Sequence, residues 1–224
     1  LYFVTHGPDG HVFSYMRAGS AASRVTPDDM PEAMIAGAKV IHASGISQAI
    51  SSSAADAVFT AMRQARAAGV LVSYDTNLRL RLWPLDRARA VIHAAVSLAD
   101  IVRPGLDDAM HLTGLTEPHE IVGFYLAMGA KVVALTLGSD GALVATREKR
   151  ERLPPVTVKA IDATGAGDMF DGAFLAEYLR TGDPFAAGRY ANVAAALSTE
   201  GYGAVAPMPR RDAVEAAIKA GRGA

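Results

Sequence analysis

One short segment, residues 162–168, combines residue types that suit the transfer of a phosphoryl group. It reads Asp-Ala-Thr-Gly-Ala-Gly-Asp and runs directly into an apolar stretch of helical character. Gly165, Ala166 and Gly167 let their backbone N–H groups crowd together at a helix start, where unpaired N–H groups and the helix dipole favour an anion. Asp168 places a carboxylate in the same turn. An anion cradle beside a base is what phosphoryl transfer to a hydroxyl requires.

Other interpretations of this turn have to be weighed. Taken alone, Gly-Ala-Gly-Asp is also compatible with an ordinary helix start, since Asp is common there. The flanking Asp162 and Thr164 and the position late in the chain favour phosphoryl transfer over that interpretation. A dinucleotide site is disfavoured because the later glycine and the downstream ribose-binding acid of its fingerprint are missing. A serine hydrolase is disfavoured because no serine lies in a Gly-x-Ser-x-Gly turn.

The elements that must position this turn alternate between short β-rich runs and longer helical runs. This alternation predicts an α/β fold with a mostly parallel central sheet. Two runs separated by Gly-Pro-Asp-Gly predict an antiparallel hairpin over residues 1–5 and 11–16. Further strands are expected over residues 38–43, 70–74, 101–102, 131–137, 142–145 and 156–161, and helices over about 51–68, 86–98, 106–113, 118–128, 169–180, 184–200 and 211–220. The mixed-charge run 147–152 is expected to form a solvated turn between strands.

Three polar turns fall where expected strands end, at residues 75–79, 138–141 and 162–168. Ligands of open α/β sheets bind beyond the carboxyl ends of the strands. We therefore expect these three turns to converge on one site.

Composition excludes several classes of function. The 224 residues are 50% hydrophobic and 20% charged with a net charge of −1, which fits one large domain, or one domain with a small appendage. Without a Lys/Arg cluster there is no electrostatic reason to expect nucleic acid or an anionic membrane as partner. The absence of cysteine excludes disulfides and thiolate metal sites. No signal-peptide pattern and no apolar run of membrane-spanning length occur, so a cytoplasmic enzyme is expected.

Several segments together resemble the PfkB carbohydrate kinases, the ribokinase-like family. Residues 162–168, with Phe170, Gly172 and Phe174, resemble the family's C-terminal signature. Residues 136–142 are similar to its nucleotide loop, residues 75–79 to its Asp-x-Asn-x-Arg turn, and residues 192–198 to the helix beside the adenine. The resemblance implies a three-layer ribokinase-like sandwich with a partial β lid, in which residues 1–20 are a remnant of the lid and residues 21–224 the kinase core.

Within that family, residues 12–23 and the combination of Arg79 with Leu82-Trp83 are similar to the 2-keto-3-deoxygluconate kinases. This resemblance implies that Tyr15, Arg17 and Arg79 contact a sugar acid. Two guanidinium groups suit a substrate carboxylate, which fructose and ribose lack. The alternatives stay open that Arg17 is an exposed strand charge, that Arg79 is a structural turn contact, and that the substrate is of the fructokinase or ribokinase type.

The reaction implied by the resemblance is transfer of the γ-phosphoryl group of ATP to a primary hydroxyl of the sugar acid. Asp168 would bind that hydroxyl and accept its proton, and the N–H groups of Gly165, Ala166 and Gly167 would hold the developing charge. ATP and Mg²⁺ are the implied cofactors, and Asp162 either supports the loop or contributes to a monovalent-cation site. The implied nucleotide contacts are Thr136, Gly138, Gly141, Gly167 and Asn192.

Two departures from the family pattern shape these expectations. Where the family often has Asn-x-x-Glu, residues 105–108 are Gly-Leu-Asp-Asp, so Asp108 is not assigned as a metal ligand. The family's first quarter, with its Gly-Gly…Asn sugar motif, is not found, and the sequence opens on Leu1 rather than Met. We therefore expect a chain without its N-terminal part, which leaves open an inactive nucleotide-binding remnant. The hairpin is also expected to offer a surface to a second subunit.

Overall fold

Two β-sheets of unequal size organise the chain. A computed structural model describes residues 2–7 and 10–223. The smaller sheet is a hairpin of β1 (Tyr2–Gly7) and β2 (Gly10–Tyr15), which pair antiparallel. The larger sheet has six strands in the order β3-β4-β5-β6-β7-β8. The predicted α/β fold and the predicted hairpin are both confirmed.

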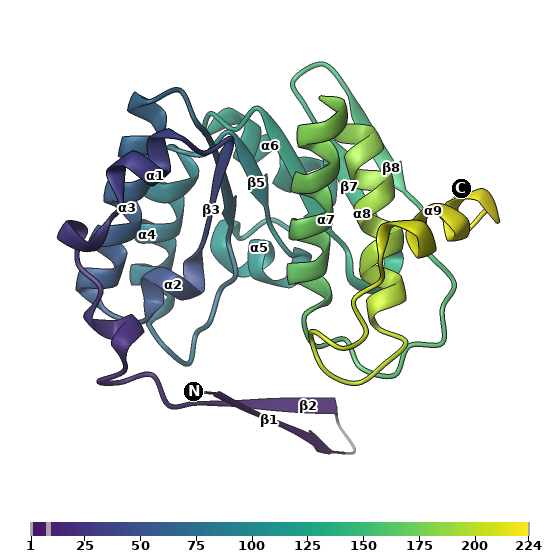
Figure 1. Cartoon of the computed structure of the whole chain (residues 1–224), viewed down its shortest axis with the longest axis horizontal. Coiled ribbons are helices and arrows are strands. Elements are labelled where there is room, and N and C mark those ends of the chain that lie inside the picture. Colours follow the sequence, from purple (N-terminus) through teal and green to yellow (C-terminus); the bar gives the residue numbers. More distant parts are fainter. Residues whose placement is uncertain (1, 8–9, 224) are drawn as a thin grey trace.

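The large sheet is parallel over its first four strands and antiparallel over its last two. Its strands are β3 (Val40–Ser44), β4 (Leu71–Asp75), β5 (Ile101–Arg103), β6 (Val132–Thr136), β7 (Ala142–Ala145) and β8 (Arg150–Leu153). Because the carboxyl ends of the parallel strands lie at the same end of the sheet, the turns that follow these strands lie together there. The small hairpin lies across the same end (Figure 1).

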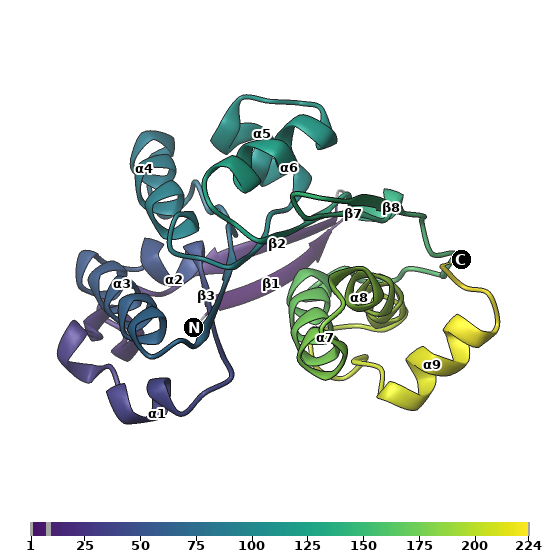
Figure 2. The same ribbon diagram turned by 90° about the horizontal axis from the view of Figure 1, so that it is seen from above.

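Helices cover both faces of the large sheet and give three layers (Figure 2). Alternate residues of β6 point into different cores: Val133 and Leu135 pack against the helices between residues 52 and 127, whereas Val132 and Ala134 pack against the helices between residues 166 and 198. This period of two is what a strand buried on both faces requires. The helices are α1 (Glu32–Ala36), α2 (Gly45–Ala49), α3 (Ser52–Ala67), α4 (Leu85–Val96), α5 (Leu106–Thr113), α6 (Pro118–Ala127), α7 (Ala166–Thr181), α8 (Pro184–Ser198) and α9 (Arg211–Lys219), with 3₁₀ turns at Ala21–Arg24, Pro27–Asp29 and Gly138–Asp140.

Local signals placed most helix ends correctly. The Ser51 hydroxyl accepts the N–H of Ala54 and caps α3, as its position before the helix predicts. Gly114 and Gly182 end α5 and α7 in the left-handed conformation, with φ of 76° and 70°. Trp83 is buried in the core, where it packs as expected.

The prediction of a strand over residues 156–161 was wrong, because this stretch has no regular structure and pairs with no strand of the large sheet.

The prediction for residues 147–152 was wrong in part. The chain turns at residues 146–149, but Arg150–Leu153 then forms the edge strand β8, paired with β7. Its outward-facing charges resemble those of a solvated turn, yet Leu153 is buried against the α7–α8 layer. Charged side chains are common on edge strands because they discourage pairing with other chains.

Two expectations about the ends of this fold stay predictions. They are the division into a lid at residues 1–20 with a core at 21–224, and contact of the hairpin with a second subunit. Among the described residues, no helix is both long and apolar enough to cross a membrane.

A buried carboxylate ties the C-terminal helices together. Glu177 on α7 accepts hydrogen bonds from the Arg180 Nε at 3.0 Å and from the Arg211 Nη1 of α9 at 2.9 Å. Only 5% of Glu177 is exposed. The hydrogen bonds from Arg180, followed by those from Arg211, lower the pKa of Glu177 to about 2.

We predict that Glu177→Gln destabilises the fold at neutral pH and not at low pH. A hydrogen bond to a charged group contributes about 1.5–3 kcal/mol, so the free energy of unfolding at pH 7 should fall by that amount. Because the folded-state pKa lies below the usual 4.5, this stabilisation is present above pH 4.5 and is lost as the pH falls towards 2. Urea denaturation at a series of pH values measures it, with the exposed Glu148→Gln as control. A difference that does not change with pH would contradict the assignment.

Candidate active site

Two cavities meet at the turn that the sequence singled out. The first, of about 340 Å³, is called here the polar cavity, and its charged lining residues are Arg17, Asp75, Arg79, Arg103, Asp108 and Asp168. The second, of about 500 Å³, is called the α8 cavity and is lined by Thr136, Gly138, Ser139 and Gly141, by residues 155–158 and by parts of α7 and α8. Ala163 and Gly167 line both cavities. The turn is therefore a shared wall of small residues between two cavities large enough to bind ligands.

The geometry of the turn depends on a glycine. Gly165 caps the N-terminus of α7 in the left-handed conformation, with φ of 78°. A Cβ at this position would stand 2.7 Å from the Ala204 Cβ, so the loop that follows α8 also requires glycine here. The Met169 N–H donates to the Gly165 carbonyl at 2.8 Å, and the Ala166 N–H donates to the Ala163 carbonyl at 3.1 Å. Residues 163–169 thus form a tight turn that becomes a helix.

The Asp162 carboxylate fixes this turn by accepting hydrogen bonds. Its Oδ1 accepts the N–H of Thr164 at 2.9 Å and the Thr164 hydroxyl at 2.7 Å, and its Oδ2 accepts the N–H of Gly203 at 2.9 Å. Asp162 is 5% exposed. These contacts fit the loop-supporting role weighed for Asp162, while a monovalent-cation role stays a prediction.

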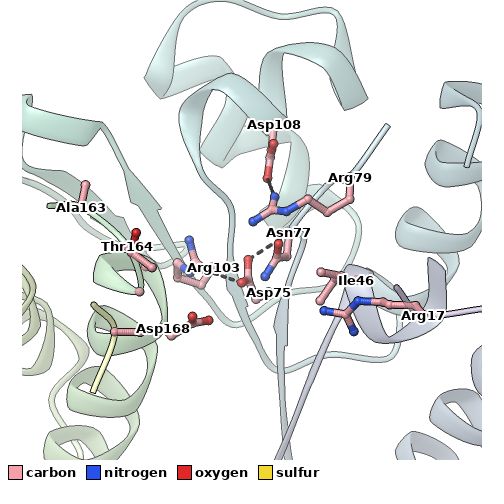
Figure 3. A pocket seen from close by; sticks show the side chains of 13 residues that line it. Arg17, Ile46, Asp75, Asn77, Arg79, Arg103, Asp108, Ala163, Thr164 and Asp168 are labelled. Atoms are coloured by element: carbon pink, nitrogen blue, oxygen red, sulfur yellow. Dashed lines mark hydrogen bonds and ion pairs between the residues drawn. The ribbon is translucent and has the colours of Figure 1, made fainter. Parts of the chain in front are cut away.

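The polar cavity contains the sequence-predicted base and arginines. Asp168 lies on the first turn of α7, faces the cavity and is exposed to it, and Arg17 and Arg79 reach the cavity from other sides (Figure 3). The Arg79 Nη1 donates to the Leu78 carbonyl at 2.7 Å and stands 3.9 Å from the Asp108 Oδ2. Burial raises the pKa of Asp108, while the Leu78 N–H that it accepts and the charge of Arg79 oppose the rise. The side chain of Tyr15 lies outside the part that the structure describes.

Behind these groups lies a buried ion cluster that the sequence did not reveal. Arg103 pairs with Asp171 through two short hydrogen bonds and also with Asp75. Burial raises the pKa of both carboxyls, and the Arg103 guanidinium opposes the rise. Two features of the sequence could have indicated this cluster. Arg103 is a charged residue at the end of a buried strand, and Asp171 is a charged residue on the buried face of α7.

The α8 cavity contains the predicted nucleotide residues Thr136, Gly138, Gly141, Gly167 and Asn192. The Asn192 Nδ2 donates to the Pro154 carbonyl at 2.9 Å, which anchors it in the wall. A Cβ at Gly141 would lie 2.2 Å from the Leu153 carbonyl oxygen, so the approach of β8 alone already requires glycine there. Gly138, with φ of 61°, has no atom within 4 Å of its Cβ position and faces open space. Residues 155–158 form a further wall that the sequence had not marked.

Comparison with known proteins decides the family. Residues 1–211 match the family described as pfkB family carbohydrate kinase. The chain belongs to this family. A 2-dehydro-3-deoxygluconokinase of Thermoproteus tenax is 36% identical over 217 residues, which is 94% of this chain and 66% of the relative. Probable fructokinase-5 of Arabidopsis thaliana is 35% identical over 219 residues, covering 93% and 67%.

Solved structures agree with this family assignment. A putative ribokinase II of E. coli in complex with ATP and Mg²⁺ superposes with a TM-score of 0.89 at 26% identity, over 98% of this chain and 70% of that one. The ribokinase-like fold that the motifs implied is therefore confirmed. This chain spans about two thirds of the length of the curated relatives given above.

We predict that Gly165→Ala lowers the free energy of unfolding more than a glycine-to-alanine change elsewhere on α7. Alanine at a left-handed position destabilises by more than about 1 kcal/mol, and the contact with Ala204 adds to this. The double variant Gly165→Ala/Ala204→Gly removes the contact but keeps the backbone strain, so urea denaturation should show partial recovery.

Gly172→Ala is the matched control. It lies on the same helix and is exposed, with no atom within 4 Å of the added Cβ, so it should leave stability unchanged or raise it slightly. Equal stability of Gly165→Ala and Gly172→Ala would contradict the geometry described for the turn.

Proposed function

We propose that this chain carries the active site of an ATP-dependent kinase that phosphorylates a primary hydroxyl of a sugar acid, with 2-keto-3-deoxygluconate as substrate and its 6-phosphate as product. The observation that carries the proposal is the shared wall: Gly167 separates a cavity for the nucleotide from a polar cavity that contains Asp168. A phosphoryl donor and a hydroxyl acceptor held on the two sides of such a wall need to move little to react.

Each group of the turn has a role in this reaction. Asp168 binds the sugar hydroxyl and accepts its proton as the oxygen attacks the γ-phosphorus, and the bond from that phosphorus to the bridging oxygen of ADP breaks. Backbone N–H groups of Gly165 and Gly167 at the start of α7 stabilise the charge of the phosphoryl group in transit. The Ala166 N–H joins them by sharing or leaving its hydrogen bond to the Ala163 carbonyl. The α8 cavity holds ATP, with Asn192 in its wall.

Magnesium fits this arrangement as a companion of ATP. The described residues include one group of three carboxylates with oxygens within 4.8 Å of one another, namely Asp75, Asp168 and Asp171. Arg103 already pairs with two of them. A protein-only cage is therefore not available there, and Mg²⁺ is expected on the ATP phosphates, where it neutralises their charge.

The arginines support a sugar acid as substrate. Arg17 and Arg79 enter the polar cavity from the side away from the turn (Figure 3), so that a bound carboxylate there would leave the far end of the sugar towards Asp168. Guanidinium groups recognise carboxylates through paired hydrogen bonds. A fructokinase-type substrate is the second candidate, because a fructokinase relative is nearly as similar, at 35% against 36% identity.

We predict ATP-dependent ADP release with 2-keto-3-deoxygluconate and much slower release with fructose or ribose. A coupled assay with the three sugars, followed by mass spectrometry of the product, measures this. Arg79→Met should raise KM for the sugar acid more than KM for a neutral sugar, because only the acid loses a charge-assisted contact. Turnover of fructose without turnover of the acid would move the chain to the second candidate. ATP binding without turnover of any sugar would indicate an inactive remnant.

We predict that Asp168→Asn lowers kcat by about two to four orders of magnitude, the range expected for loss of a general base. Because Asp168 does not line the α8 cavity, the Kd for ATP should change little, which calorimetry can measure. Asp56→Asn, an exposed position on α3, is the control for loss of a negative charge. Unchanged kcat in Asp168→Asn would exclude this residue as the base.

A further inference from the structure

Arg103 is buried between two carboxylates that come from different layers of the fold. Its Nε and Nη2 donate to the two oxygens of Asp171 at 2.6 and 2.9 Å, and Nη2 also pairs with the Asp75 Oδ2. The three side chains are 10%, 7% and 1% exposed, respectively for Arg103, Asp171 and Asp75. Asp75 ends β4, Arg103 ends β5, and Asp171 lies on α7. The cluster therefore joins the parallel strands to the helix that carries the proposed base.

The guanidinium also lies directly behind the turn. A Cβ on Gly167 would stand 3.5 Å from both Nη1 and Nη2 of Arg103. Asp168 follows Gly167, and one of its carboxylate oxygens lies within 4.8 Å of oxygens of Asp75 and Asp171. Figure 3 shows Arg103 between the Asp168 side of the site and Asp75. A fixed positive charge thus supports the turn from behind at its thinnest point.

Stability alone does not explain this cluster. Buried ion pairs of this kind are often replaceable by apolar residues without loss of stability. Here one guanidinium faces two buried carboxylates, so the charges do not balance, and burial raises the pKa of both acids. Asp168 adds a third carboxylate nearby, which raises the pKa of Asp171 further. His42 is the other titratable group described at Asp171: its Nε2 is 3.9 Å from the Oδ2, and burial lowers its own pKa. Burying these charges costs free energy, and the cluster lies against the turn at Gly167. Its role is therefore better explained by the residues that it holds in position than by stability.

We propose that Arg103 is a positioning residue for phosphoryl transfer: through Asp171 it fixes α7 against β4 and β5, and so holds Asp168 and the N–H groups of Gly165–Gly167 in place for the substrate. This inference rests on the proposed function of the turn. A misplacement of about 1 Å is enough to lower a rate a hundredfold, so loss of this tie should reach the chemistry although Arg103 is neither base nor nucleophile.

The first test separates kcat from KM. Arg103→Met should lower kcat about a hundredfold. KM for ATP should change much less, because Arg103 does not line the α8 cavity and most of the lining comes from outside residues 163–171. Arg103→Lys should recover only part of kcat, because one ammonium cannot make the two parallel hydrogen bonds to Asp171. Arg66→Met, which removes an exposed arginine bonded to the Leu98 carbonyl, is the matched control and should keep wild-type kcat.

A double variant separates positioning from folding. Arg103→Met leaves two buried carboxylates without their guanidinium partner and should also destabilise the fold. Arg103→Met/Asp171→Met removes one of them together with the guanidinium, so resistance to urea should largely return while kcat stays low. If kcat returns together with stability, or if Arg103→Met keeps wild-type kcat, the cluster is only structural and the proposal is overturned.

Hydrogen–deuterium exchange keeps the inference testable without activity. Arg103→Met should speed exchange in residues 163–171 by about tenfold or more relative to Arg66→Met, because the tie that holds the turn is lost. If the wild-type chain phosphorylates none of the sugars, the proposed function fails and exchange alone decides the positioning role. Unchanged exchange in residues 163–171 would overturn it.

Discussion

The three hydrogen bonds accepted by the Asp162 carboxylate are the contacts on which the site depends. They join Thr164 in the turn to Gly203 in the loop after α8, two segments far apart in the sequence. The same loop presses Ala204 against Gly165, which leaves no room for a Cβ. The turn is thus held between the Asp162 carboxylate and the loop that carries Gly203 and Ala204. A backbone held in this way can present its N–H groups in one direction without reorganising when charge develops.

These contacts also explain how the polar cavity and the α8 cavity can share a wall made of small residues. Ala163 and Gly167 line both spaces, and neither has a side chain that could fill one of them. A wall of small residues would be soft if nothing supported it. The guanidinium of Arg103 lies behind Gly167, and Asp162 lies below Thr164, so the turn is supported where it is thinnest. Rigid support of a small-residue turn is what allows its backbone, rather than its side chains, to contact a ligand.

The sequence predicted what local signals and parallel strand order determine, and missed what depends on distant pairing. Gly114, Gly182 and Ser51 mark helix ends through their own backbone or side chain, so those ends were placed correctly. The convergence of residues 75–79 and 138–141 follows from the parallel order of β4 and β6, after which they come. Residues 162–168 follow no strand and reach the same site at the start of α7, and residues of all three turns line the polar and α8 cavities. The edge strand β8 was missed because its charges suit solvent as well as a strand. The pairing of Arg103 with Asp171 joins positions 68 apart, and no local pattern announces such a pair.

Arg103 and Arg79 both line the polar cavity but differ in the strength of their contacts with neighbouring side chains, and this difference separates their roles. Arg103 makes two short, buried hydrogen bonds to Asp171, so turning it towards a ligand would leave buried carboxylates unpaired at a large cost. Arg79 stands 3.9 Å from Asp108, with 36% and 28% of the two side chains exposed. An ion pair this long and this exposed contributes about 0–1 kcal/mol, so releasing it costs little. The one hydrogen bond from Arg79 to the Leu78 carbonyl, at 2.7 Å, is half-buried and can be replaced by water or by a ligand when the side chain turns. A substrate carboxylate that accepts two hydrogen bonds from Arg79 would more than offset that loss. Arg79 is therefore suited to reorient towards a sugar acid, whereas Arg103 is suited to keep the turn where it is.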